Sequence, residues 1–83
     1  MGAIKIKIDL YVIEKVKERR IELKMSQAIL AFRLGVSYGF IGQVESINYP
    51  AKYNINHLDK LAAIFNCSPK DFLPDKPFAN SVE

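Results

Sequence analysis

Two short helical patterns meet within residues 26–45 of the sequence. The first repeats apolar residues every three or four positions, so one face of that helix needs a packing partner. These residues are Ile29, Leu30, Ala31 and Leu34. Gly35 follows and ends a helix at positive φ without steric cost, while Ser26 and Ser37 are suitable N-caps for the two helices. The segment therefore predicts a helix-turn-helix.

The second pattern, residues 37–46, has only a narrow apolar stripe. Ile41 and Val44 are spaced to face a core. The other face has no core to fill and carries Tyr38, Gly39, Gly42, Gln43 and Ser46. A helix that packs through two residues and presents the rest to solvent suits an element held in the DNA major groove. We therefore predict that residues 37–46 form a recognition helix.

Length and composition exclude several classes of protein. A chain of 83 residues makes one domain. The single cysteine, Cys67, lies ten residues from the single histidine, His57, so we expect no disulfide, metal site or cofactor. We expect Cys67 to fill a small core position, and His57 to be a surface or capping residue. No segment has the ~20 apolar residues of a membrane span or the apolar run of a signal peptide, which predicts a cytoplasmic protein.

The basic residues are unevenly distributed. The net charge is +3, but residues 1–33 carry eight Lys and Arg against four acids, and residues 34–83 carry four against five. No cation occurs between Leu34 and Ala51. Any phosphate contacts must therefore come from flanking segments and from helix N-termini, and we expect modest, strongly salt-dependent DNA binding.

The first eight residues alternate isoleucine and lysine. Ile4, Ile6 and Ile8 would lie on one face of a strand, with Lys5 and Lys7 on the other. A lone strand is unstable in water, so it would pair with the same strand of a second subunit. The alternative is an extended arm laid along the domain with its isoleucines in contact.

A long helix is predicted from Asp9, as its N-cap, to about Leu23. Its core-facing residues are expected to be Leu10, Ile13, Val16 and Leu23. Arg20 falls on the same face, where an apolar residue is expected. After the recognition helix, Pro50 marks the loop 46–53, because proline disfavours helical geometry at the residue before it.

Two more helices are predicted in the second half. Asn54 or Asn56 caps a fourth helix, and Ser68 followed by Pro69 opens a short fifth one. Their inward-facing residues are expected to be Ile55, Leu58, Leu61, Ala62 and Phe65 in the fourth, and Phe72 and Leu73 in the fifth. The expected division is an N-terminal arm or strand (1–9), a helix-turn-helix domain (10–74) and a loose tail (75–83).

These elements, in this order, resemble the lambda-repressor/Cro-like (XRE) helix-turn-helix family. The resemblance covers roughly Ile13 to Leu73. It is carried by SQAILAFRLGVS and IGQVE in the middle of the chain and by LAAIFNCSPKDFL near its end. It implies an all-α, compact five-helix DNA-binding domain, preceded by a short N-terminal β-strand or an extended arm.

The resemblance also implies roles for individual residues. Arg20 is expected to pair with Glu45 through two parallel hydrogen bonds, which would fix the third helix against the first. Gln27 matches a phosphate-contacting glutamine, and Gln43 matches a base-reading position where glutamine pairs with adenine. Lys52 is the best-placed phosphate cation, because the loop after the third helix lies along the DNA backbone in this family. The other phosphate cations considered are Arg33, Lys5 and Lys7.

Base contacts begin at the start of the recognition helix in this family. Tyr38 is expected to contact a thymine methyl or a phosphate, and Phe40 either a thymine methyl or the loop 47–53. Gly39 and Gly42 have no side chain for readout, so they either permit close approach to DNA or leave a helix that becomes firm only on binding. The expected DNA-binding residues are Ser26, Gln27, Arg33, Ser37, Tyr38, Gly39, Phe40, Gly42, Gln43 and Lys52.

The function expected from these features is regulation of transcription. A homodimer, with one helix-turn-helix for each half of a roughly palindromic operator, would bind double-stranded DNA specifically and act as a repressor. The alternative is a protein-interaction module of the same fold, antitoxin-like or an adaptor, with weak or lost DNA readout. An enzyme is not expected, because the sequence has no nucleophile–base set, no paired carboxylates and no phosphate loop. No small-molecule ligand is evident.

Overall fold

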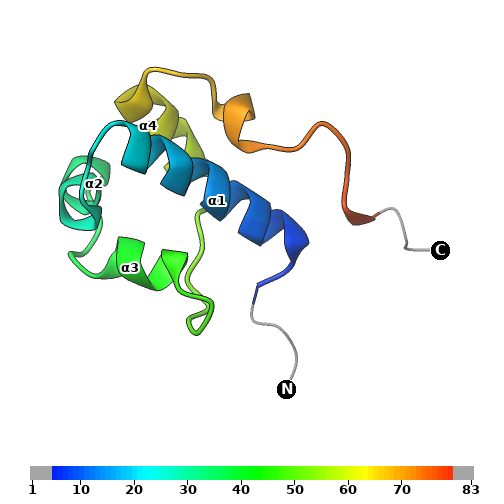
Figure 1. The fold of residues 1–83 in the computed structure, drawn as a ribbon, viewed down its shortest axis with the longest axis horizontal. Helices are drawn as coiled ribbons and strands as arrows, with labels where there is room; N and C mark the ends of the chain where they lie inside the picture. The colour runs from blue at the N-terminus through cyan, green and yellow to red at the C-terminus, as the bar shows by residue number, and fades with distance from the viewer. Residues whose placement is uncertain (1–4, 80–83) are drawn as a thin grey trace.

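The computed structural model of the chain describes residues 5–79 and is all-helical. Its elements, drawn in Figure 1, are α1 (Lys7–Glu22), α2 (Gln27–Leu34), α3 (Phe40–Glu45), α4 (Ile55–Phe65) and the 3-10 helix η1 (Pro69–Phe72). No strand occurs within residues 5–79. The all-helical class is thus confirmed, whereas the expected fifth helix is one short 3-10 segment.

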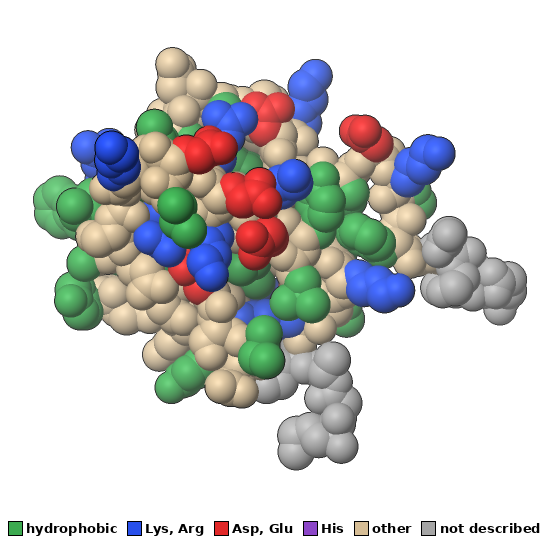
Figure 2. All heavy atoms as spheres, in the orientation of Figure 1, with side chains coloured by type: hydrophobic (Ala, Val, Ile, Leu, Met, Phe, Trp, Pro, Cys, Tyr) green, Lys and Arg blue, Asp and Glu red, His purple; other side chains and the backbone are tan. Residues whose placement is uncertain are grey.

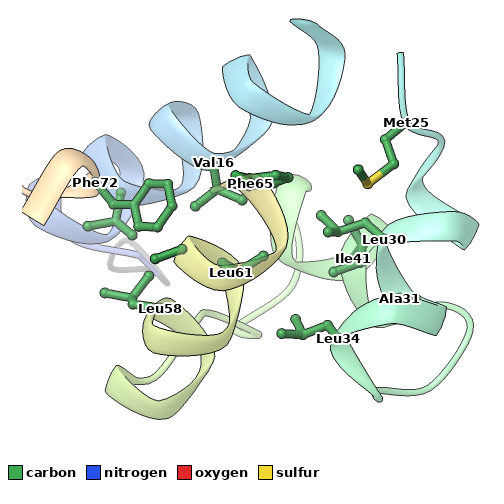
Figure 3. Packing of buried hydrophobic residues seen from close by; sticks show 12 residues of the cluster. Val16, Met25, Leu30, Ala31, Leu34, Ile41, Leu58, Leu61, Phe65 and Phe72 are labelled. Carbon is green, nitrogen blue, oxygen red and sulfur yellow. The ribbon is translucent and has the colours of Figure 1, made fainter. Parts of the chain in front are cut away.

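The other elements are arranged around α1, the longest helix (Figure 1). It contacts α3, α4 and η1, while α2 contacts α3 and α4. Each of the five elements contributes a fully buried side chain to one core: Val16, Leu30, Ile41, Leu61 and Phe72 (Figure 3). None of the helices in the described part of the chain has the length and apolar character needed to cross a membrane.

Most of the apolar residues assigned to the core are buried. They are Ile13, Val16, Leu30, Ala31, Leu34, Ile41, Val44, Leu58, Leu61, Ala62, Phe65 and Phe72. The assignment is wrong for five others, which are exposed: Leu10, Leu23, Ile29, Ile55 and Leu73. Each of these five lies within about one turn of a helix end, where the periodic pattern continues but no neighbouring element covers the side chain.

Helix α1 begins earlier than predicted, and Asp9 is not its N-cap. The N-cap is Ile6, whose backbone is extended (φ −91°, ψ 174°). Asp9 lies in the first turn, where its Oδ2 accepts a hydrogen bond from the Ile6 backbone N–H at 2.9 Å. A carboxylate in the first turn also complements the helix dipole, so Asp9 stabilises the helix start from a position inside the helix.

The predicted N-terminal strand is wrong where the structure can be compared with it. Lys7 and Ile8 belong to α1, and residues 1–4 of the predicted strand lie outside the described residues. The expected sidedness is also reversed, because Lys5 is only 5% exposed and Ile6 is 60% exposed. Lys5 is buried because backbone carbonyls at the end of α3 accept hydrogen bonds from its ammonium group.

The caps of the later helices follow the prediction. Of the two asparagines considered, Asn54 caps α4: its Oδ1 accepts from the His57 backbone N–H at 2.7 Å. His57 returns a contact, since its Nδ1 accepts from the Asn54 N–H at 3.1 Å, which makes a reciprocal capping box. Ser68 Oγ accepts from the Lys70 N–H ahead of η1, with Pro69 in the first position. His57 is therefore a capping residue.

Candidate nucleic-acid interface

The helix-turn-helix is present, but its second helix is shorter than expected. Ser26 Oγ accepts from the Ile29 N–H at 3.1 Å and caps α2, and Gly35 ends α2 in the left-handed region (φ 78°, ψ 30°). The prediction that Ser37 caps a helix over 37–46 is wrong. A turn intervenes, Gly39 is the N-cap of α3, and Ser37 contributes its backbone carbonyl to the Phe40 N–H at 3.0 Å.

Helix α3 packs through two side chains and exposes the rest of its surface. Ile41 and Val44 are fully buried against the core. Gln43 is exposed on α3, and Tyr38, in the turn before it, is 81% exposed. This sidedness agrees with the narrow apolar stripe in the sequence and leaves one face of α3 open to a partner.

A groove runs between the start of α2 and the start of α3. It has a volume of about 320 Å³ and is lined by Ser26, Gln27, Ala28, Tyr38, Gly39 and Gly42. Five of these six were expected to bind DNA, and the fold brings them together from two segments of the chain. Three predicted residues of α3 and its turn do not line the groove: Ser37 and Gln43 are exposed, and Phe40 is half-buried.

The side chain of Gln27 lies close to Gly42. Its Nε2 donates to Glu45 Oε1 at 2.9 Å, so the side chain reaches from α2 toward the end of α3. A Cβ placed on Gly42 would lie 3.2 Å from Gln27 Oε1. Gly42 therefore leaves room for Gln27. A Cβ on Gly39 would meet nothing within 4 Å, so that position is open.

Arg20 and Glu45 form a bidentate ion pair next to Gln27, one of the residues that line the groove. Arg20 Nε donates to Glu45 Oε2 and Arg20 Nη2 donates to Glu45 Oε1, both at 2.9 Å, and the side chains are 11% and 5% exposed. Arg20 Nη1 also donates to the Met25 carbonyl at 2.8 Å. Together with Gln27, the pair joins α1, α2 and α3 at one point.

Comparison with protein families identifies this arrangement. Residues 15–77 match the family model of the Cro/C1-type HTH DNA-binding domain. The chain belongs to this family. Its helix-turn-helix, α2 and α3, lies within the matched region. No curated protein matches the chain in sequence.

Solved structures show where else the fold of this Cro/C1-type domain occurs. The hypothetical transcription factor NHTF from Neisseria is similar over 82% of this chain and 76% of that one, with 18% identity and a TM-score of 0.70. The restriction-modification controller protein C.AhdI from Aeromonas hydrophila is similar over 77% and 94%, with 23% identity and a TM-score of 0.66. Hydroxypropylphosphonic acid epoxidase from S. wedmorenis is similar over 81% of this chain but only 35% of that one, with 24% identity and a TM-score of 0.68.

Lys5 of this Cro/C1-type domain does not have the role expected of it. Its ammonium group donates to the carbonyls of Val44 and Ser46, both at 2.5 Å, and to that of Gln43 at 3.3 Å. Burial lowers the pKa of Lys5, and the nearby Asp9 carboxylate opposes this shift. A buried lysine with three carbonyl acceptors is unsuited to bind phosphate, so that prediction is wrong.

Lys52 also forms an ion pair within the domain. Its Nζ lies 3.0 Å from Asp9 Oδ2, although the side chain is 46% exposed. Burial alone would raise the pKa of Asp9, but the Ile6 N–H and Lys52 outweigh it and lower the pKa overall. Arg33, at the end of α2, and Lys7 are exposed. The described residues contain no cluster of three or more acidic, His or Cys side chains that would hold a metal ion.

Phe40 follows the packing alternative and not the base-contact one. It is half-buried, with its ring centroid 5.3 Å from that of His57 and 6.3 Å from that of Tyr53. The Tyr53 hydroxyl is buried without a hydrogen-bond partner among the described residues. Burial and the Glu45 carboxylate raise the pKa of Tyr53, and Arg20 acts in the opposite direction.

Sequence reasoning missed the two lysine contacts, although one signal for Lys5 was available. The last turn of α3 has no basic residue, and the negative end of a helix favours a cation. The absence of cations between Leu34 and Ala51 bears on any DNA contacts of this segment. It also indicates that a cation for the end of α3 must come from a distant segment of the chain.

Proposed function

We propose that this chain is a sequence-specific DNA-binding transcriptional regulator that represses by occupying an operator. The observation that carries the proposal is the groove between α2 and α3, because its lining residues come from both helices of the helix-turn-helix of a Cro/C1-type domain. The proposed action is non-enzymatic. It consists of holding a duplex and excluding other proteins from it.

Phosphate contacts are assigned to the first turn of α2. The backbone N–H groups of Gln27 and Ala28 have no acceptor within their helix, and the helix dipole favours an anion there. Ser26 and the exposed Gln27 lie at the same end. A phosphate oxygen at this edge of the groove would accept from these amides, which fixes the register of the protein on the duplex.

Base contacts are assigned to Tyr38 and Gln43. Both are exposed at α3, and a glutamine amide can pair with N6 and N7 of adenine in the major groove. In this assignment the Tyr38 ring packs against a thymine methyl, or its hydroxyl donates to a phosphate oxygen. Gly39 is open, so the backbone at the start of α3 can approach the DNA closely.

The small size of this surface supports a homodimer on a palindromic operator as part of the proposal. Helix α3 has six residues and offers few side chains for readout, so one copy would discriminate weakly between sequences. Two copies related by a two-fold axis would place two α3 helices in successive major grooves, roughly 34–36 Å apart. Each half-site would then contribute its own set of contacts.

The decisive experiment is selection of genomic DNA fragments by the purified chain at two salt concentrations, about 50 mM and about 200 mM. The proposal expects a small set of related sites with inverted repeats to be retained at the higher salt. Gln43→Ala should relax the preference at one position of each half-site. Asn56→Ala, an exposed change on α4, is the matched control and should leave the selected sites unchanged. Loss of all fragments at the higher salt would contradict the proposal.

A protein-interaction module, antitoxin-like or an adaptor, is the second candidate, and one observation favours it. Phe32 is 86% exposed and Tyr38 is 81% exposed, and they border a groove of about 180 Å³ with Ala28, Ala31 and Val36. Hydrophobic side chains protrude over α2 in the surface view of Figure 2. This candidate predicts that Phe32→Ser abolishes capture of a protein partner, whereas the regulator needs no such capture.

A further inference from the structure

We propose that Lys5 is a positioning residue for DNA binding. It holds the C-terminal end of α3 in its binding conformation from the protein side and does not contact the DNA. The inference rests on the proposed DNA-binding function. It gives Lys5, which lies outside the helix-turn-helix, a role in positioning the recognition helix α3.

Helix α3 has little intrinsic stability. It is six residues long, has a glycine in its interior and receives no side-chain hydrogen bond at its N-cap. An isolated helix of that length does not form in water, because nucleation is costly and few hydrogen bonds follow it. Its conformation therefore depends on contacts from the rest of the domain.

Lys5 supplies the contacts that the end of α3 lacks. The last carbonyls of a helix have no backbone donor four residues further on. Here those of Val44 and the following Ser46 accept from the Lys5 ammonium group, as does that of Gln43, which also accepts from the Ser46 N–H. An ammonium group has three N–H donors, so all of them are used. Its positive charge also lies at the negative end of the α3 dipole.

The contact fixes α3 relative to α1 at a second point. Lys5 lies two residues before α1 begins, and Arg20 lies in its last turn. One binds the final carbonyls of α3 and the other binds the carboxylate of Glu45, so cations from both ends of α1 hold the same end of α3. Asp9 fixes the backbone beside Lys5 through the Ile6 N–H.

A phosphate contact and a positioning contact make different predictions for salt dependence. Removing a lysine that binds phosphate lowers the slope of log affinity against log salt by about 1. Removing a lysine that only holds α3 weakens binding at every salt concentration and leaves the slope unchanged. Because Lys5 is 5% exposed and its donors are occupied, we expect the second behaviour.

The test compares Lys5→Met with Lys7→Met in the full chain. Both remove one positive charge, but Lys7 is exposed in the first turn of α1. Without DNA, amide hydrogen exchange should become at least about tenfold faster at residues 43–46 of the Lys5→Met variant, from the usual strength of a hydrogen bond to a charged group. Exchange in α4 should stay unchanged, and Lys7→Met should show the exchange rates of the wild type in this DNA-free measurement. Lys5→Arg, which keeps a charged donor, should restore part of the protection.

With a selected DNA site, Lys5→Met should lower affinity about tenfold or more at all salt concentrations, with the wild-type slope. Unchanged exchange at residues 43–46, equal acceleration in α4, or a slope reduced by about 1 would each overturn the inference. If the wild-type chain binds no DNA site, the proposed function fails. The exchange measurement then still decides whether Lys5 holds α3.

Discussion

Arg20 and Glu45 meet through two parallel hydrogen bonds of 2.9 Å, which join the last turn of α1 to the last residue of α3. Both side chains are almost fully buried. The arginine also binds the Met25 carbonyl just before α2, so the same guanidinium touches the connection into the helix-turn-helix. The position of α3 is therefore fixed by this ion pair as well as by its short apolar stripe, Ile41 and Val44.

Glu45→Ala should destabilise the domain by about 3 kcal/mol, because it leaves the Arg20 guanidinium buried without its partner. It also removes the acceptor of Gln27 Nε2, so DNA affinity should fall as well. Urea unfolding and binding to a selected site measure the two effects. Asp59→Ala, an exposed acid on α4, is the control for loss of one negative charge.

A double variant tests whether the cost comes from the unpaired charge. Replacing both partners, as in Arg20→Met with Glu45→Met, removes the buried charges together and should be less destabilising than Glu45→Ala alone. If Glu45→Ala melts at the wild-type temperature, the ion pair does not hold α3.

Gly42→Ala should separate the stability of α3 from its DNA binding. Alanine in a helix interior is favoured over glycine by up to about 1 kcal/mol, so the free energy of unfolding should rise. The new Cβ would lie 3.2 Å from Gln27 Oε1, so the end of the Gln27 side chain must shift, and the phosphate binding proposed at this end of α2 should weaken. A lower DNA affinity in a more stable protein is therefore expected, measured by urea unfolding and fluorescence anisotropy.

The same change in a Gln27→Ala background is the control. Without the glutamine, Gly42→Ala should stabilise the domain and leave DNA affinity unchanged from that background, a coupling that a double-mutant cycle measures. An equal loss of affinity in both backgrounds would show that the Cβ itself obstructs the DNA.

His57 should make stability fall with acidification. Burial, followed by the Lys60 charge, lowers the pKa of His57 below its ordinary value of 6.5, and its neutral Nδ1 accepts the Asn54 N–H. A lowered folded-state pKa means that the unfolded chain binds the proton more readily. Stability is then complete above pH 6.5 and is lost as pH falls through the folded-state pKa. Urea unfolding at about pH 7.5 and about pH 5 measures this loss.

Because His57 is the only histidine, its ring protons titrate without overlap in an NMR spectrum. His57→Gln keeps an acceptor at the third helical position but does not titrate, so it should remove the pH dependence in that range while retaining the cap. A folded-state pKa at or above 6.5 would contradict the assigned role.

The parts of the fold set by local pattern could be predicted from the sequence. Ser26, Gly35, Asn54 and Ser68 cap or end helices as expected, because capping depends on a few adjacent residues. The Arg20–Glu45 pair was predictable for a different reason: Arg20 stands out as a charge on an apolar face, and the family resemblance implies Glu45 as its partner. The boundaries of α3 were not, because Ser37 and Gly39 are both acceptable N-caps and tertiary packing chooses between them.

The contacts of Lys5 could not be predicted from the alternation of isoleucine and lysine at the start of the sequence. An alternating pattern predicts which side chains face water and which face an apolar core, and it places lysine on the solvent side. Here the acceptors are carbonyls at the end of α3, almost forty residues away in the chain. The approach of Gln27 to Gly42 is likewise made between two helices. Both contacts are non-local, and a single sequence carries no direct record of them.

Tyr53→Phe should raise the free energy of unfolding by about 1 kcal/mol, which is the scale of the penalty for a buried unsatisfied hydroxyl. The Tyr53 hydroxyl is buried without a partner among the described residues, while its ring contacts Phe40 and His57. Phenylalanine keeps these ring contacts and removes the desolvated oxygen. Urea unfolding measures the change, and Tyr49→Phe, at a 48% exposed tyrosine, is the control and should be neutral. A destabilised Tyr53→Phe would mean that the hydroxyl has a hydrogen-bond partner in solution, with the nearby Arg20–Glu45 pair as the first place to look for it.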